Sequence, residues 1–304
     1  MDRVTSSDGV NYGAVLALAA ISFMLLRKWI AGGVCKSCAR LDGKTVVITG
    51  ANTGIGRETA RDMAHRGARV IMACRDLTRA ESTAEYIRRS TGNGNVVIRH
   101  LNLASLYSVR EFAKEFIATE ERLDILINNA GVMMCPKWIT EDGFETQLAV
   151  NHLGHFLLTN LLLGMLKRSS PSRVVNVSSV AHVGGTGVSS YCLHPGVIRT
   201  ELNRHILLWY PMLKTILSLP SMLLMKTPWQ GAQTSIYCAV IEGLERKSGC
   251  YFRMAAQLKA LFELRPLLYS DCAEKHPAPE GEDDAVARRL WEESAQLVGL
   301  NNLH

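Results

Sequence analysis

The sequence has 304 residues, which suits one large domain or two small ones, and its apolar share of 47% is typical of a chain with a sizeable core. The formal net charge is +6, and the basic residues are spread along the chain rather than gathered in long runs. This distribution argues against a nucleic-acid partner and fits an anionic cofactor or an anionic membrane surface.

The first predicted element is an apolar run over residues 10–26, closed by Arg27 and Lys28. Its length is at the lower edge of what spans a bilayer. A signal peptide would carry its basic residues before the apolar run. We therefore interpret residues 10–26 as a membrane anchor, with an interfacial helix as the alternative. The basic flank predicts that the following chain faces the cytosol.

Eight cysteines in a chain of this length do not make a disulfide framework, so we expect free thiols in a reducing compartment. Cys35 and Cys38 form half of a zinc site without a second half, and no metal is expected. Because they follow the apolar run closely, lipid attachment is a minor alternative. Residues 1–40 are thus predicted to be an anchor and linker.

From residue 41 onward, strand and helix patterns alternate. Continuous apolar, strand-like runs alternate with segments of helical periodicity, which is typical of a doubly wound parallel sheet covered on both faces. We expect one domain over residues 41–304. The expected strands are residues 44–49, 67–74, 96–101, 123–127, 173–177 and 188–193, and the expected helices are residues 58–64, 77–89, 106–118 and 151–166.

The turn after the first strand reads Thr49-Gly-Ala-Asn-Thr-Gly-Ile-Gly56. Its glycines let the backbone approach a pyrophosphate and offer helix N-terminal amides to it, although glycines also mark ordinary tight turns. The residues expected to bind a dinucleotide here are Gly50, Asn52, Thr53, Gly54, Ile55 and Gly56.

Two arginines flank this turn and the end of the second strand. NAD selectivity usually needs an acidic residue at that strand end, to bind the ribose 2′-hydroxyl, whereas Arg75 comes first here. With Arg57 it could bracket a 2′-phosphate, for which the planar guanidinium is well matched. The pattern favours NADP(H); the alternative is that both arginines are solvated surface residues.

Further motifs follow in a fixed order: Asn128-Asn-Ala-Gly131, Asn151, Asn176-Val-Ser-Ser179, and Pro195-Gly196 with Thr200. With the glycine turn, they resemble the short-chain dehydrogenase/reductase family over about residues 41–252, which implies a Rossmann-type fold. Residues 51–57, 72–76, 124–133 and 150–159 look like the vertebrate retinol dehydrogenases of types 12, 13 and 14. Residues 287–294 look most like type 13. The resemblance implies NADP(H)-dependent interconversion of retinaldehydes and retinols.

The resemblance also implies roles for single residues. Asn102, where the family often has Asp, and Leu103 would lie near the adenine; Asn129 would brace the sheet with Asn128. Ala130 and Gly131 would line the cofactor cleft, and Pro195, Gly196 and Thr200 would hold the nicotinamide end. Ser179 would bind the substrate oxygen. Asn151 would position a water in the proton relay, with a helix N-cap as its alternative role.

The family's catalytic Tyr, with a Lys four residues later, belongs on a helix between the fifth and sixth strands. Only about eight residues follow Ser179 before the next strand, fewer than the dozen that a parallel crossover needs. We therefore predict a sheet interrupted by loss of this crossover helix. Tyr210 and Lys214 match the spacing, but Pro211 and their position make the match a coincidence, and Tyr191 has Pro195 in place of Lys.

Three consequences are expected of this loss. The second face of the helix over residues 151–166 should be exposed, the chain should fold poorly or associate, and its activity should be impaired. Residues 253–269 look inserted relative to the family, so alternative splicing or misassembly could account for both changes. The alternative function is a non-catalytic NADP(H)- or retinoid-binding variant, or a partner of the full-length enzyme.

The apolar segment at residues 203–228 is expected to cover an apolar substrate, with ordinary core as the alternative. The prolines and the lysine within it argue against a second membrane span. The pattern leaves open the oligomeric state, and whether the anchor enters the endoplasmic reticulum or the mitochondrion.

Overall fold

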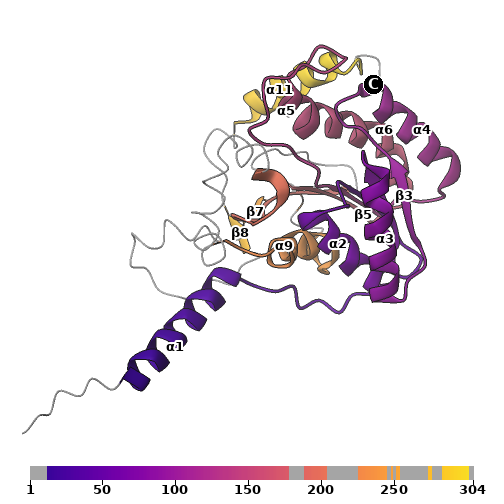
Figure 1. Cartoon of the computed structure of the whole chain (residues 1–304). Helices are drawn as coiled ribbons and strands as arrows, with labels where there is room; N and C mark the ends of the chain where they lie inside the picture. Colours follow the sequence, from indigo (N-terminus) through magenta and orange to yellow (C-terminus); the bar gives the residue numbers. More distant parts are fainter. Residues whose placement is uncertain are drawn as a thin grey trace, which may run out of the picture.

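The computed structural model describes residues 12–177, 188–203, 225–244, 248, 251–253, 273–275 and 283–300. They form one eight-stranded sheet in the order β3-β2-β1-β4-β5-β6-β7-β8, in which only β8 is antiparallel to its neighbour (Figure 1). The strands are β1 (Thr45–Thr49), β2 (Arg69–Cys74), β3 (Val96–His100), β4 (Ile125–Asn128), β5 (Ser172–Val177), β6 (Val188–His194), β7 (Tyr251–Arg253) and β8 (Ala273–Lys275).

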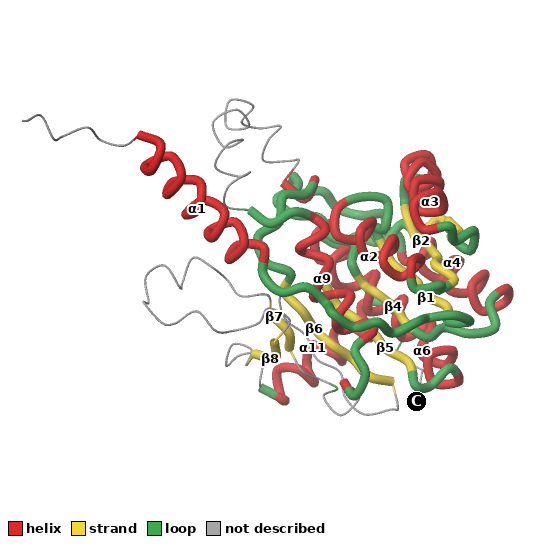
Figure 2. The backbone as a smooth tube through the Cα atoms, turned by 90° about the horizontal axis from the view of Figure 1, so that it is seen from below, coloured by secondary structure: helices red, strands yellow, loops and turns green. Residues whose placement is uncertain are grey.

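Helices cover both faces of this sheet (Figure 2). One face packs against α2 (Gly54–His65), α3 (Leu77–Thr91) and α9 (Pro228–Val240). The other packs against α4 (Leu106–Thr119) and α6 (Gly154–Arg168). Within β1, Val46 and Ile48 belong to the first layer and Val47 to the second, because successive side chains of a strand point to opposite faces. The predicted doubly wound Rossmann-type fold is confirmed.

The junction between β5 and β6 departs from the predicted interruption. β6 pairs directly with β5 in parallel, in a register that runs from Ser172 beside Val188 to Val177 beside Leu193. Ten residues, 178–187, separate the two strands in the sequence and lie outside the described residues. The sheet is thus continuous across this junction, because the backbone groups of β5 and β6 bond to one another directly, and the predicted interruption of the sheet is not seen.

The helix expected to open at Asn151 begins earlier. A short α5 (Thr146–Leu148) leads through a π-helical turn, η1 (Ala149–Leu153), into α6. The N-cap is Glu145, whose carboxylate accepts a hydrogen bond from the Leu148 amide at 2.9 Å. The N-cap role for Asn151 is therefore wrong, since this residue lies within a helical turn.

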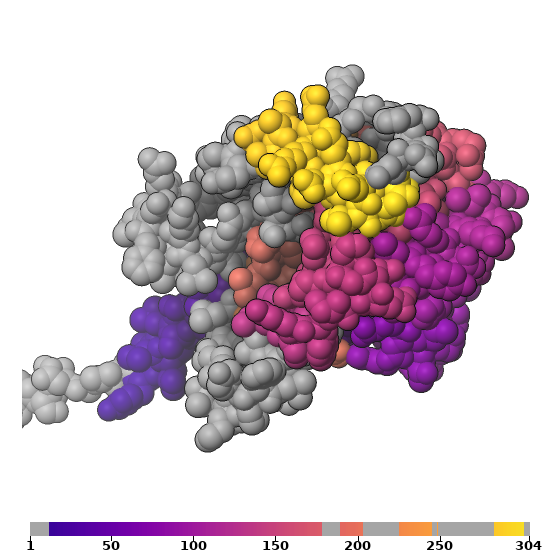
Figure 3. All heavy atoms as spheres, turned by 90° about the horizontal axis from the view of Figure 1, so that it is seen from above, coloured from indigo at the N-terminus to yellow at the C-terminus, as the bar shows by residue number. Residues whose placement is uncertain are grey.

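The second face of α6 is not exposed as expected. Its side chains Phe156, Leu161 and Leu163 are half-buried. The C-terminal helix α11 (Asp284–Leu297) lies against this region (Figure 3), where Trp291 meets Phe156 edge-on at a ring-centroid distance of 4.8 Å. Part of this burial, at Phe156, thus comes from α11, a contact between distant segments that helical periodicity does not reveal.

The N-terminal helix α1 (Tyr12–Ala31) projects from the domain and continues past the expected end of the apolar run (Figure 1). It is long and apolar enough to cross a membrane, and nearly all of its surface is exposed. Its base contacts the domain: Ile30 is 2% exposed, and Nη1 of Arg27 donates to the Met225 carbonyl at 3.2 Å. A second stretch, Thr146–Arg168, passes the same test of length and composition, but half of it is buried as a core helix.

Several expectations fall outside the described residues. These are the position of Ser179, the spacing match between Tyr210 and Lys214, residues 204–224 of the proposed substrate segment, and residues 254–269 of the proposed insertion. The division of the chain at residue 40 stays a prediction. The cysteines that the structure describes are free thiols: Cys35, Cys38, Cys74, Cys135, Cys192 and Cys238.

Candidate cofactor site

A cleft of about 650 Å³ opens at the carboxyl ends of the parallel strands, where β1 and β4 lead to opposite faces of the sheet. Ligands of open α/β sheets bind at such a switch point. With two exceptions, the predicted site residues line this one cleft: Gly50, Asn52, Thr53, Gly54, Ile55, Gly56, Arg75, Asn102, Leu103, Asn129, Ala130, Gly131, Asn151, Pro195, Gly196 and Thr200. The exceptions are Arg57, which lines an adjoining cavity, and Ser179.

The glycine turn is held close to the segment that follows β4. Gly50 has a φ of +65°, and a Cβ there would lie 2.9 Å from Cα of Ala130. A Cβ on Gly56 would lie 2.4 Å from the Gly50 carbonyl oxygen and 2.5 Å from Nδ2 of Asn129. Both positions therefore need glycine, for backbone conformation at Gly50 and for space at both.

The first turn of α2 suits an anion. Thr53 occupies the N-cap position, yet its side chain makes no capping hydrogen bond, whereas Asp76 caps α3 and Ser105 caps α4. The leading amides of α2 thus face the cleft without a side-chain acceptor. A Cβ on Gly54 would approach Cγ2 of Thr200, on the opposite wall, at 3.3 Å. Glycine at this point therefore lets the first turn of α2 approach the wall that carries Thr200 closely.

A hydrogen-bond network ties the turn to β4. Oγ1 of Thr49 accepts from the amides of Asn129 and Ala130, each at 2.9 Å, and the Asn129 side chain donates to the Thr49 carbonyl at 2.8 Å. Nδ2 of Asn128 donates to Oδ1 of Asn176 on β5 at 2.8 Å, and to the Thr159 hydroxyl of α6 at 3.0 Å. These asparagines hold three strands and a helix in register around the cleft.

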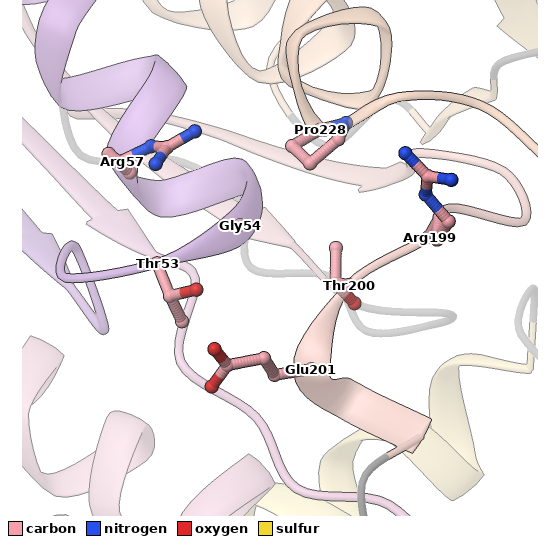
Figure 4. Close-up of a pocket in the computed structure, with 7 residues that line it drawn as sticks. All are labelled: Thr53, Gly54, Arg57, Arg199, Thr200, Glu201 and Pro228. Atoms are coloured by element: carbon pink, nitrogen blue, oxygen red, sulfur yellow. The ribbon is translucent and has the colours of Figure 1, made fainter. Parts of the chain in front are cut away.

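The two arginines expected to bracket a 2′-phosphate lie in adjoining cavities. Arg75 lines the large cleft, while Arg57 lines a neighbouring cavity of about 320 Å³ (Figure 4). The Arg57 guanidinium binds Oε1 of Glu58 at 2.8 and 3.1 Å and lies 5.9 Å from the ring centre of Tyr86. Arg57 is therefore already engaged, because its neighbour along α2 supplies a carboxylate.

Asn151 lies on the π-helical turn, and its side chain clamps the loop that follows β4. Oδ1 accepts from the Val132 amide at 2.8 Å, while Nδ2 donates to the Val132 carbonyl at 2.9 Å. Both ends of the amide are thus used to hold the cleft wall. The expected role in a proton relay stays a prediction.

Sequence reasoning missed three charged residues of the cleft: Asp76, Arg79 and Glu201. Oδ1 of Asp76 accepts from the Arg79 amide at 3.0 Å, and Nη2 of Arg79 reaches both carboxylate oxygens of Glu201, at 2.7 and 2.9 Å. Two features of the sequence could have pointed to Arg79 and Glu201. Arg79 stands four residues after Arg75, and Glu201 directly follows Thr200.

Known proteins share this fold and these motifs. The pattern described as short chain dehydrogenase matches residues 44–193. Retinol dehydrogenase 13 of Homo sapiens is 47% identical over 328 aligned positions, which take in 94% of this chain and 94% of that protein. Retinol dehydrogenase 12 of Bos taurus is 46% identical, with coverage of 90% and 92%.

Solved structures agree with the sequence relatives. An uncharacterized protein from Mycobacterium paratuberculosis superposes with a TM-score of 0.60 at 32% identity, covering 88% of this chain and 98% of that one. The NADP complex of RhlG from Pseudomonas aeruginosa has a TM-score of 0.53 at 24% identity, with coverage of 67% and 92%, and supports the fold alone. The chain belongs to the short-chain dehydrogenase/reductase family, within its retinol dehydrogenase group.

Proposed function

We propose that this chain binds NADP(H) in the cleft but does not by itself interconvert retinal and retinol, because residues 178–187, between β5 and β6, contain neither the Tyr that donates the proton in the family nor the Lys that accompanies it. The observation that carries the proposal is that sixteen of the predicted cofactor and substrate residues line one cleft, while only ten residues join β5 to β6 in the sequence. The chain is thus an oxidoreductase by descent that keeps its cofactor site.

The preference for NADP(H) rests on charge at the end of β2. Arg75 lines the cleft there, and the carboxylate that follows it at the same strand end, Asp76, is committed to capping α3. A carboxylate that accepts the Arg79 amide is poorly disposed to bind a ribose 2′-hydroxyl as well. A guanidinium at this strand end favours the cofactor that carries a 2′-phosphate.

The missing proton donor follows from chain length. The register sets Val188 beside Ser172, five residues back along β5 from Val177. This return covers roughly 17 Å. A helix rising 1.5 Å per residue needs about eleven residues for that distance before any turn is added. Ten residues are there, and none of them is Tyr or Lys.

The relatives support the same view. The alignment with human retinol dehydrogenase 13 runs over 328 positions, more than the 304 residues of this chain. Some residues of retinol dehydrogenase 13 in this alignment therefore have no counterpart in this chain.

In this proposal each part has a separate task. When bound, the nicotinamide ring supplies or accepts the hydride. The chain's own residues bind the phosphates through the amides of α2, hold the cleft wall through Asn151, and fix the turn through Asn129. With no acid beside the substrate oxygen, the negative charge formed after hydride transfer is not neutralised, and reduction stalls.

The substrate class and the location come from the relatives and from α1. The relatives are named as retinol dehydrogenases, so the apolar ligand is proposed to be a retinoid. We propose that α1 anchors the chain in the membrane of the endoplasmic reticulum or the mitochondrion, with the domain on the cytosolic side.

The test uses the full chain, purified in detergent micelles. NADPH should raise the midpoint of thermal unfolding and bind saturably, while all-trans-retinal should give no NADPH oxidation above the rate without protein. Binding without turnover is also what the alternative, a non-catalytic binding variant or partner of the full-length enzyme, requires. Co-purification of that enzyme from membranes would favour the partner role. Loss of NADPH binding would refute the proposal.

A further inference from the structure

An ion pair crosses the cofactor cleft between elements 122 residues apart in the sequence. Nη2 of Arg79, in the first turn of α3, binds both carboxylate oxygens of Glu201, at 2.7 and 2.9 Å. Glu201 opens the short helical turn η2 (Glu201–Asn203), directly after Thr200. Both residues line the cleft, so the pair joins the wall near β2 to the wall near β6.

The Glu201 carboxylate lies in the cleft, held by Arg79 at the start of α3, next to the end of β2 where a 2′-phosphate is expected. Figure 4 shows its side chain directed from η2 toward Thr53 in the glycine turn. The leading amides of α2 open at the same turn, and Arg75 lies in the same cleft. The carboxylate thus occupies the guanidinium that an anionic group bound at the end of β2 would also use.

Arg79 is well placed to change partners. Its amide is fixed by Oδ1 of Asp76, which anchors the first turn of α3, while its long side chain can turn toward either wall. The side chains of Arg79 and Glu201 are 50% and 47% exposed, so water screens their attraction. Such a pair contributes little, and its loss changes an equilibrium by at most about five-fold. A phosphate dianion offers Arg79 a stronger acceptor.

We propose that Arg79 is a further 2′-phosphate-binding residue and that Glu201 is a built-in competitor, which holds Arg79 until NADP(H) replaces the carboxylate. This inference rests on the proposed NADP(H) site. An NAD(H) molecule, which lacks the 2′-phosphate, leaves the ion pair in place. The exchange therefore acts on the discrimination between the two cofactors rather than on dinucleotide binding as such.

The experiment measures the Kd of NADPH and of NADH by nicotinamide fluorescence on the full chain in micelles. The variants are Glu201→Gln, Arg79→Gln and the double variant. Glu81→Gln is the matched control, because Glu81 pairs with Arg88 on the same helix away from the cleft.

Glu201→Gln should bind NADPH up to about five-fold more tightly, and NADH within two-fold of the wild-type chain. Arg79→Gln should weaken NADPH binding by about ten-fold, with little effect on NADH. In the Arg79→Gln background the second change should have no effect, since the competitor then has nothing to hold. The control should match the wild-type chain.

Three results would overturn the inference. Equal changes in the Kd of NADPH and of NADH would mean that the ion pair affects pyrophosphate binding or the stability of the fold, not binding of the 2′-phosphate. A gain on Glu201→Gln that persists without Arg79 would mean simple charge repulsion. Wild-type affinity for NADPH in every variant would refute the exchange at Arg79 but not the NADP(H) site. If the wild-type chain did not bind NADPH at all, both proposals would be refuted.

Discussion

The hydroxyl of Thr49 lies 2.8 Å from Nε2 of His155, and this contact determines which ring nitrogen carries the proton. Oγ1 of Thr49 already accepts from the amides of Asn129 and Ala130, so we assign its own proton to Nε2 at 2.8 Å rather than to the Ile127 carbonyl at 3.5 Å. The proton of the neutral ring is then on Nδ1, 3.5 Å from the carbonyl oxygen of Asn151. His155 thereby connects the end of β1 to the π-helical turn.

This arrangement predicts that stability falls in mild acid. Burial lowers the pKa of His155 to about 4, from an ordinary value of 6.5. Because the unfolded chain binds the proton more readily, the contribution of His155 is complete above pH 6.5 and is lost as the pH falls toward 4. The loss is at most about 3 kcal/mol. Burial also lowers the pKa of His152, which acts in the same direction.

The measurement compares thermal unfolding midpoints at pH 7 and pH 5 for the wild-type chain and for His155→Gln. At pH 7 the variant should have a lower unfolding midpoint than the wild-type chain. Its midpoint should fall by less than that of the wild-type chain between pH 7 and pH 5. The exposed His100 provides the control, as His100→Gln should follow the wild-type chain at both values. An acid loss in His155→Gln as large as that of the wild-type chain would contradict this account.

The glycine turn predicts a sharp contrast between two alanine substitutions. Gly56→Ala would set a methyl group 2.4 Å from the Gly50 carbonyl oxygen, so we expect destabilisation by about 1–3 kcal/mol and at least a ten-fold loss in NADPH affinity. Gly94→Ala has open space and should change neither. Equal NADPH affinity in the two variants would show that the turn does not contact the cofactor.

The two arginines of the predicted phosphate bracket should differ in effect. Arg75→Gln should weaken NADPH binding by about ten-fold and NADH binding only slightly, since Arg75 lines the cleft itself. Arg57→Gln should cost less, because Glu58 already holds that guanidinium. Fluorescence titrations with both cofactors check the order. A larger loss for Arg57→Gln would mean that the cofactor draws Arg57 away from Glu58.

Much of the fold followed from sequence because its signals are local. The apolar runs gave the strands, and the glycines between Gly50 and Gly56 marked the turn, since a parallel sheet buried on both faces needs both features. Contacts between distant segments had no such signal. The burial of Phe156 by Trp291 and the pairing of Arg79 with Glu201 depend on how separate elements pack, which periodicity does not encode.

The membrane helix predicts two outcomes for truncation. Removing residues 1–26 should release the chain from membranes and leave its unfolding midpoint unchanged, because the base of α1 keeps its contacts. Removing residues 1–38 also takes away the buried Ile30 and the bond from the Cys35 amide to Gln233, and should lower the midpoint by several degrees. Carbonate extraction and thermal scans measure the two effects. If the chain without residues 1–26 stayed in the membrane fraction, the proposed anchoring role of α1 would be contradicted.

The missing crossover can be supplied from a relative. Replacing residues 178–187 with a crossover helix that carries the family's Tyr and Lys should create NADPH-dependent retinal reduction, since the predicted cofactor residues already line one cleft. The same graft with its Tyr changed to Phe is the matched control and should bind NADPH without turnover. A graft that binds NADPH and retinal but stays inactive would mean that other catalytic parts are absent.

The most direct measurement is the rate of retinal-dependent NADPH oxidation by the purified, ungrafted chain, at an NADPH concentration that its own fluorescence titration shows to be saturating. We predict a filled cofactor site and a rate no higher than that of a sample without protein. Sustained turnover under these conditions would contradict the central claim, because the chain would then possess a proton donor that the β5–β6 junction has no room to carry.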